Sequence, residues 1–108
     1  MNQNGKVTAT GVSGRKYEFS VYPWGQSFKP VGGVYLVLKK KSNLQPNYDV
    51  LYVGQTGDLS ERFDAHHKQQ CFDRNGKTHI GVRVENVEQT RLGIERDLLG
   101  NYKPICNF

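Results

Sequence analysis

Apolar and polar residues alternate along several short stretches of this chain, a pattern typical of strands with one buried side. Two of these stretches, residues 33–38 and 48–53, are especially rich in β-branched and aromatic side chains. Gly, Pro, Asn and Ser residues separate the stretches and are typical of turns. The pattern predicts strands over residues 7–10, 16–22, 33–38, 48–53 and 79–85.

Two other stretches have helical spacing. Asp58 and Glu61 resemble the capping box that begins a helix, and this helix is expected to run to about residue 70. One face of it would carry Leu59, Arg62, Phe63 and His66. A second helix is predicted over residues 88–99, with Gly100 and Asn101 at its end and Pro104 beyond. Its apolar stripe is expected to consist of Leu92, Leu98 and Leu99.

The order of these elements predicts an α+β fold with a central antiparallel sheet of three or more strands flanked by helices. The length, 108 residues, fits one domain. We expect residues 33–108 to form its core and residues 1–32 to form a strand-rich extension packed on the same domain.

A hairpin is expected between the strands at 33–38 and 48–53. If its midpoint falls between Asn43 and Leu44, Tyr35 lies directly opposite Tyr52, and opposed residues share a face of the sheet. Gly33 and Gly54 adjoin these tyrosines and could let a ligand approach the backbone. From the strand pattern alone, the phenols either line a ligand site or only pack against each other.

The net charge of the chain indicates which class of partner it would bind. The formal net charge is +5 and the isoelectric point about 9.3, which favours an anionic partner such as nucleic acid or an anionic membrane surface. No apolar run approaches the roughly 20 residues that span a bilayer, so no membrane partner is expected.

The two cysteines, Cys71 and Cys106, lack CxxC spacing and nearby histidine pairs, so zinc is not expected. We expect two free thiols in a reducing cytosol. The first residues also lack the apolar stretch of a signal peptide, so a cytoplasmic location is predicted.

Three residues could carry chemistry. Arg62 either binds a phosphate through its guanidinium or lies along the surface as an ordinary exposed arginine. His66 follows one helical turn later. Glu95 falls among Leu92, Leu98 and Leu99, where an unpaired carboxylate is costly. Either an ion pair with Arg91 or a divalent cation would compensate it.

These residues, taken in order, resemble the GIY-YIG endonucleases. Gly33-Val34-Tyr35 and Tyr52-Val53-Gly54 are similar to the two signature triplets of the family. The run from Tyr52 to His66 is similar to its triplet, turn and helix, with Arg62 and His66 at the expected places. Glu95 matches the glutamate of a later helix, and Pro104 and Asn107 match a terminal segment. The resemblance covers residues 33–107.

The resemblance implies a metal-dependent endonuclease that hydrolyses phosphodiester bonds, in DNA rather than RNA. It implies that one Mg²⁺ or Mn²⁺ is held by Glu95, that Arg62 contacts the scissile phosphate and that Asn107 orients a group of the pocket. Tyr35 is the leading general base, with Tyr52 beside it. His66 is the rival base, because its unperturbed pKa of about 6.5 suits the task better.

Two features depart from the family pattern: the interval between the triplets, residues 36–51, is long, and Gln55 stands where several members have a lysine. The side chains expected to add phosphate contacts around the site are Lys39, Lys40, Lys41, Gln55, Lys68 and Arg74.

Alternatives remain at this stage. The domain could have the same fold and bind nucleic acid without cutting it. It could also bind a protein partner through its N-terminal aromatic residues. That segment could stack single-stranded bases, although we expect it to cover a sheet edge. A single-stranded or branched DNA substrate, a homodimer and a targeting protein are all compatible with the chain.

Overall fold

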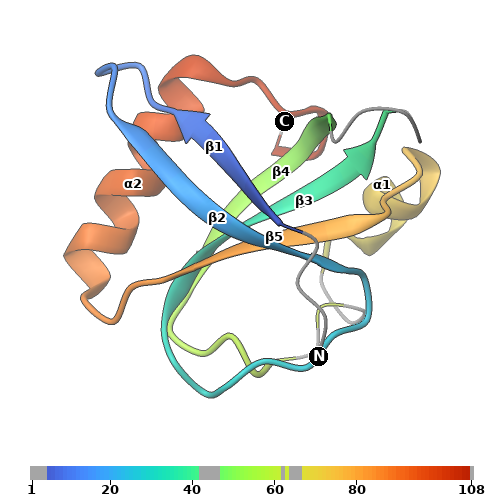
Figure 1. Cartoon of the computed structure of the whole chain (residues 1–108), viewed down its shortest axis with the longest axis horizontal. Coiled ribbons are helices and arrows are strands. Elements are labelled where there is room, and N and C mark those ends of the chain that lie inside the picture. The colour runs from blue at the N-terminus through green and yellow to red at the C-terminus, as the bar shows by residue number, and fades with distance from the viewer. Residues whose placement is uncertain (1–4, 42–46, 62, 64–66, 108) are drawn as a thin grey trace.

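One antiparallel sheet, in the strand order β1-β2-β5-β3-β4, organises this computed structural model (Figure 1). The structure describes residues 5–41, 47–61, 63 and 67–107. The strands are β1 (Lys6–Thr10), β2 (Lys16–Pro23), β3 (Gly33–Lys40), β4 (Tyr48–Thr56) and β5 (His79–Val84). Two α-helices, α1 (Gln69–Arg74) and α2 (Glu88–Asn101), and a 3-10 helix, η2 (Ile105–Asn107), complete the described elements. The predicted α+β class with an antiparallel sheet is confirmed.

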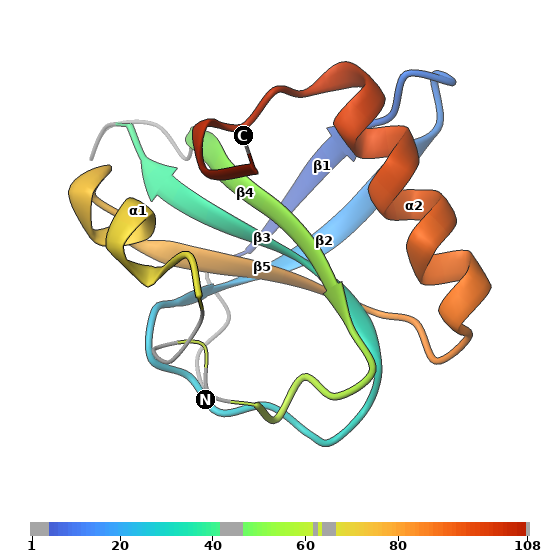
Figure 2. The same ribbon diagram turned by 180° about the vertical axis from the view of Figure 1, so that it is seen from behind.

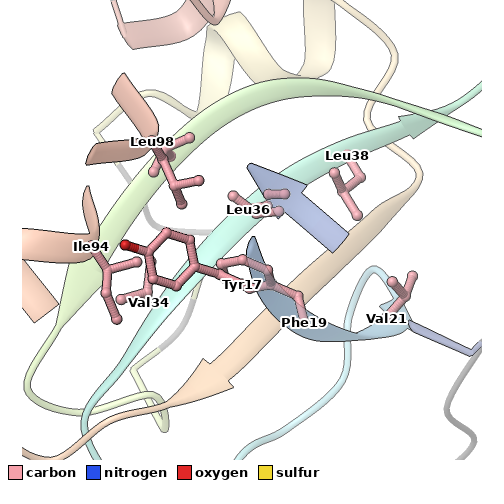
Figure 3. Close-up of a cluster of buried hydrophobic side chains, with 10 residues drawn as sticks. Tyr17, Phe19, Val21, Val34, Leu36, Leu38, Ile94 and Leu98 are labelled. Atoms are coloured by element: carbon pink, nitrogen blue, oxygen red, sulfur yellow. The ribbon is translucent and has the colours of Figure 1, made fainter. Parts of the chain in front are cut away.

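Strand β3 is the centre of the molecule. It pairs with β4 on one side and β5 on the other, and its residues from Gly33 to Leu38 are all buried. Val34, Leu36 and Leu38 face one way and pack against Ile94 and Leu98 of α2, as Figure 3 shows. A strand covered on both faces needs a nearly continuous apolar run, and this is the reason for the sequence Val-Tyr-Leu-Val-Leu.

The opposite face of the sheet has its own core. Tyr35 and Val37 of β3 lie with Leu51, Ile80 and Phe72, the last of which comes from α1. The two α-helices therefore cover opposite faces (Figures 1 and 2). In the described part of the chain, no helix is both long and apolar enough to cross a membrane.

A register shift interrupts the β3–β4 hairpin. Val37 pairs with Tyr52, whereas the residue after it, Leu38, pairs with Val50. Leu51 is therefore an extra residue in β4. A bulge of this kind turns two successive side chains to the same side. Leu51 and Tyr52 consequently both join the core around Tyr35, while Val50 and Val53 on either side join the core under α2.

The predicted pairing of Tyr35 with Tyr52 is wrong in detail. Tyr35 lies opposite Gly54, and Tyr52 lies opposite Val37. The prediction assumed a symmetric hairpin without an extra residue. It nevertheless placed both phenols on one face, and this part is confirmed because the register differs by an even number of residues.

The N-terminal strands extend the sheet beyond β5, to which β2 is paired. They turn at Ser13-Gly14, as predicted, with Gly14 in the left-handed region at a φ of 91°. Asp97 of α2 holds this hairpin: its carboxylate accepts hydrogen bonds from the Ser13 backbone, the Ser13 hydroxyl and the Tyr17 hydroxyl.

The helix predicted over residues 58–70 is wrong in its bounds. Asp58 accepts hydrogen bonds from the backbone and hydroxyl of Ser60, so it closes a local turn instead of capping a helix. The backbone of Leu59 donates to the carbonyl of Val31, and tertiary contact thus replaces helical bonding there. The helix α1 begins only at Gln69.

The helix α2 forms where it was predicted, but its buried face differs. Leu92 is 38% exposed, and the buried residues are Arg91, Ile94 and Leu98. The predicted stripe gave priority to leucines, whereas the packing of α2 on β3 and β4 rotates the helix so that an arginine faces inward.

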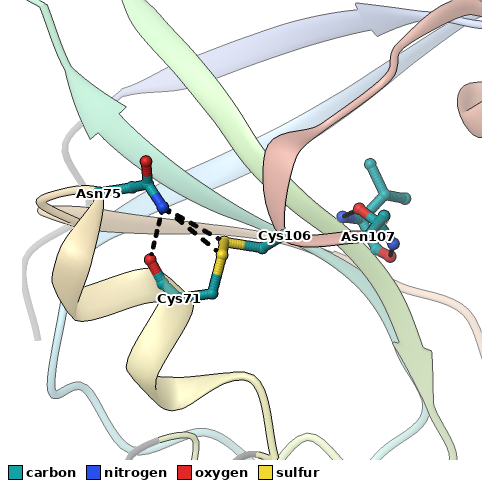
Figure 4. The surroundings of a disulfide bond; sticks show 5 residues. Cys71, Asn75, Cys106 and Asn107 are labelled. Carbon is teal, nitrogen blue, oxygen red and sulfur yellow. Dashed lines mark hydrogen bonds between the residues drawn. A yellow bond between two sulfur atoms is a disulfide. The ribbon is translucent and has the colours of Figure 1, made fainter.

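The two cysteines are joined in a disulfide between Cys71 of α1 and Cys106 of η2 (Figure 4), so the prediction of free thiols is wrong. They are 35 residues apart in sequence, and only the fold brings α1 and η2 together. Asn75 donates a hydrogen bond to the carbonyl of Cys71. Because disulfides persist mainly in oxidising compartments, the cysteines no longer support a cytoplasmic location.

We expect reduction of this disulfide to lower the free energy of unfolding by roughly 2–4 kcal/mol, since it closes a long loop. Urea unfolding with and without a reductant measures the difference, and Cys71→Ser, already without the bond, should not respond to the reductant. Titration of two free thiols in the folded, non-reduced wild type would contradict the disulfide.

Candidate active site

Tyr35 and Tyr52, of the Gly33-Val34-Tyr35 and Tyr52-Val53-Gly54 triplets, meet on the face of the sheet opposite α2. Their ring centroids are 6.1 Å apart with an interplanar angle of 32°. Tyr35 is only 4% exposed, whereas Tyr52, on the edge strand, is half-buried. The bulge at Leu51 is the local cause of this meeting, because it turns Tyr52 toward Tyr35.

Gly54 makes room for the phenols. A Cβ at this position would lie 2.6 Å from both Cζ and Oη of Tyr35 and 2.8 Å from a ring carbon of Tyr52. At Gly33 a Cβ would lie 2.7 Å from Cδ1 of Leu59. The prediction that these glycines let a ligand approach is therefore wrong: the protein's own side chains fill the space.

Glu95 of α2 is the acidic member of the site. It is half-buried, and loss of hydration raises the pKa of its carboxyl above the ordinary value. Its charge reaches both phenols, because it raises the pKa of Tyr35 and of Tyr52. Glu95 comes from α2, on the other face of the sheet, and acts on the phenols through its charge.

One of the two alternatives for Glu95, an ion pair with Arg91, does not form. Arg91 donates from Nε to Oε1 of Gln55 at 2.9 Å and from Nη1 to the backbone carbonyls of Glu85 and Asn86. Arg91 therefore bonds to other groups and does not compensate the charge of Glu95.

Both phenols resist ionisation in these surroundings. Burial is the main cause of the raised pKa of Tyr35, and the neighbouring Tyr52, Glu95 and Glu61 add to it. The pKa of Tyr52 is also raised, again mainly by burial and then by Glu95. These two residues are thus phenols, not phenolates, at neutral pH.

Arg91 has a structural role that the sequence analysis, which considered it only as a partner of Glu95, did not predict. It is 6% exposed and ties the start of α2 to the end of β4 through Gln55. A Cβ at Gly32 would lie 2.5 Å from its Nη1, which explains the glycine there. Arg91 has helical spacing with Ile94 and Leu98, and this spacing is the signal in the sequence that could have indicated its burial. Gln55 was predicted to contact nucleic acid, but its amide oxygen accepts a hydrogen bond from this arginine.

Asn107 holds β4 from its free edge. Its Oδ1 accepts from the backbone N–H of Val53 at 2.8 Å, and its Nδ2 donates to the carbonyl of Val53 at 2.9 Å. Figure 4 shows it next to Cys106 in the C-terminal segment, which the disulfide ties to α1. Asn107 is accordingly a positioning residue for the Tyr52-Val53-Gly54 triplet.

Two predicted site residues, Arg62 and His66, lie outside the described residues. Their neighbours in the chain, Glu61 and Phe63, are described. Glu61 influences the pKa of Tyr35, and the ring centroid of Phe63 lies 4.9 Å from that of Tyr35.

The charged residues predicted to contact phosphate lie at the far end of the β3–β4 hairpin and at or next to α1. Lys39 follows Tyr35 and Val37 on one face and is exposed at the far end of β3. Lys41 forms an exposed ion pair with Asp49 at 3.3 Å. The other described members are the half-buried Lys40 and Lys68 and the exposed Arg74.

No protein-family model, curated protein or solved structure matches this chain. Within residues 5–41, 47–61, 63 and 67–107, no three His, Cys, Asp or Glu side chains are grouped as a metal site.

We expect Gly54→Ala to destabilise the protein by about 1–3 kcal/mol, because the added methyl group displaces the rings of Tyr35 and Tyr52. Gly93→Ala is the matched control: a Cβ on this exposed helical glycine meets nothing within 4 Å, and the variant should gain about 0.5–1 kcal/mol. Chemical denaturation measures both, and equal stabilities would contradict the packing described for Gly54.

Glu95→Gln should unfold at a slightly higher temperature than the wild type at pH 7. The raised pKa of Glu95 means that its protonated form favours the folded state, so this contribution is present below about pH 4.3 and is lost as the pH rises through the folded pKa. The advantage of the variant should therefore shrink toward pH 4. Glu88→Gln, at the exposed start of the same helix, should show no gain.

Proposed function

We propose that this protein is a metal-dependent endonuclease that hydrolyses phosphodiester bonds of nucleic acid, with DNA as the preferred substrate. The observation that supports it most directly is the meeting of Tyr35 and Tyr52 on one face of the sheet, where the charge of Glu95 acts on both phenols. These are residues of the segments that resemble the GIY-YIG endonucleases. The net charge of +5 favours a polyanionic substrate.

The properties of Glu95 fit a divalent cation such as Mg²⁺ or Mn²⁺. Its carboxylate is half-buried and has no ion pair with a described residue, which is costly unless a cation compensates it. Mg²⁺ is often held by one or two carboxylates, with water and phosphate oxygens as the other ligands. When bound, such an ion would neutralise negative charge that develops on the phosphate and its leaving group.

The phenols would act in this proposal as hydrogen-bonding groups. Because burial raises the pKa of both, Tyr35 and Tyr52 keep their protons at neutral pH and can orient the attacking water and a phosphate oxygen. The role of general base then falls to His66, whose ordinary pKa of about 6.5 matches the working pH. This assignment reverses the order of the two candidates that the sequence suggested.

Arg62 is proposed to bind the scissile phosphate. A guanidinium donates two parallel hydrogen bonds to phosphate oxygens, and its charge offsets the additional negative charge of the transition state. Its neighbours in the chain, Glu61 and Phe63, adjoin Tyr35, which is compatible with this role. The lysines of the β3–β4 hairpin and of the region around α1 would add contacts to phosphate without base specificity.

The purified protein is expected to cut DNA in Mg²⁺ or Mn²⁺ and not in EDTA. Glu95→Gln, Arg62→Ala and His66→Ala should each lose at least about a hundredfold in rate, in the range of a general base or of one charge-stabilising group. Plasmid, single-stranded DNA and RNA, compared at equal phosphate concentration, identify the substrate.

Lys103→Ala, an exposed residue between α2 and η2, is the control variant and should retain full activity. In addition, Mn²⁺ should raise the unfolding temperature of the wild type more than that of Glu95→Gln. Binding of DNA without cleavage under every condition would replace the endonuclease proposal by that of an inactive binding module of the same fold.

The pH dependence distinguishes the two bases. With His66 as the base, the cleavage rate should rise with pH up to about 6.5 and then stay level, because the neutral imidazole accepts the proton. Single-turnover rates in Mg²⁺ between pH 5.5 and pH 9.5 provide the measurement. A rate that keeps rising tenfold per pH unit above pH 8, and that does so only when Tyr35 is present, would assign the base to the phenol instead.

A further inference from the structure

Beside the phenols lies a cavity that the proposed hydrolysis does not use. The loop after β2 and the loop after β4 run side by side in both views (Figures 1 and 2). Between them is a cavity of about 320 Å³, within the size range of small-molecule sites. Its lining residues include Trp24, Phe28, Phe63 and Ile80.

The aromatic side chains around the cavity form one connected group. The ring of Phe63 lies 6.3 Å from that of Trp24 and 6.1 Å from that of Phe28, both in edge-to-face geometry. All three rings are half-buried, so part of each remains accessible. Protein interiors rarely leave a void larger than a water molecule, and an open space bounded by aromatic rings therefore suggests a ligand with a flat, apolar face.

The remaining lining of the cavity is polar. Gln26, Ser27 and Ser60 offer groups that donate and accept hydrogen bonds, and Glu61 offers a carboxylate that accepts them. A nucleobase has the matching construction, since its faces stack on aromatic rings and its edge carries donors and acceptors. The ammonium group of Lys77, which is ion-paired with Asp73, lies 5.1 Å from the ring centroid of Trp24.

The position of the cavity connects it to the proposed reaction. Phe63 touches both places: its ring lines the cavity and lies 4.9 Å from that of Tyr35. A nucleotide whose phosphate lies at Tyr35 therefore has its own base, or the next one, within reach of the cavity. A base that is paired and stacked in a duplex cannot enter it, because its faces are covered.

We propose that the cavity between Trp24, Phe28 and Phe63 receives an unpaired nucleobase, so that the substrate is single-stranded nucleic acid or a single-stranded segment of it. This inference rests on the proposed function for the identity of the polymer. It assigns a binding role to the loop after β2, which lies outside the segments that carry the family resemblance.

The test uses Trp24, the one tryptophan of the chain, as its own reporter. In EDTA, where no hydrolysis is expected, a short oligonucleotide that cannot pair with itself should quench the fluorescence of Trp24 in a saturable way. The same sequence within a duplex closed at both ends by loops, used at the same phosphate concentration, should quench far less.

Phe28→Leu should weaken the binding of the oligonucleotide about tenfold, the loss expected when one stacking partner is removed. Ser27→Phe, a substitution at an exposed loop position, should also weaken binding, because its ring would occupy the cavity. It also keeps the test valid if Phe28→Leu does not fold. Tyr102→Leu, which removes a half-buried aromatic residue outside the lining of the cavity, should bind as the wild type does.

Equal quenching by the single strand and the closed duplex, or wild-type affinity in both cavity variants, would overturn the inference. Cleavage assays separate this failure from that of the proposed function. Metal-dependent cutting that is equal on single strands and closed duplexes, and unchanged by Phe28→Leu, overturns the base site and leaves the endonuclease. Cavity-dependent quenching without any cleavage leaves the base site and overturns the endonuclease.

Discussion

The extra residue in β4 decides which side chains meet in this protein. Next to the hairpin end, the strands pair so that Leu38 faces Val50, and continuing that register would place Tyr35 opposite Val53. Tyr52 would then point to the face under α2, because a shift of one residue moves a side chain to the other face. The bulge at Leu51 adds that one residue. As a result Tyr52 joins Tyr35, and Val53 is left to fill the core against α2.

An edge strand with a bulge needs support, and three contacts from outside the sheet provide it. The amide of Asn107 bonds twice to the backbone of Val53, at the point where the register has just changed. The disulfide ties the segment that carries Asn107 to α1. At the other end of the same triplet, Gln55 is held by the buried Arg91. The tyrosine of β4 is therefore positioned by a backbone fixed on both sides, as a preorganised site requires.

The arrangement of the polar groups at the site lowers the stability of the folded protein. Glu95 is half-buried and forms no ion pair with a described arginine, and its charge opposes ionisation of both phenols. The nearby arginine instead stabilises the fold through backbone carbonyls and Gln55. Proteins retain such costs mainly where a ligand or a reaction compensates them. The half-buried aromatic rings beside Tyr35 fit this description as well, since they surround an open cavity instead of filling it.

The sequence by itself determined the strands, the second helix and the α+β class, because alternation, turn residues and helical spacing are local signals. It also put Tyr35 and Tyr52 on one face and singled out Glu95 as a carboxylate among apolar neighbours that needs an ion pair or a cation. Only the tertiary structure decided the rest. The bulge, the short α1 and the phase of α2 result from packing between distant segments, which outweighs local preference at Asp58, Leu59 and Leu92. The disulfide and the bonds of Asn107 and Arg91 join residues that no local pattern connects, because the fold brings them together across the chain.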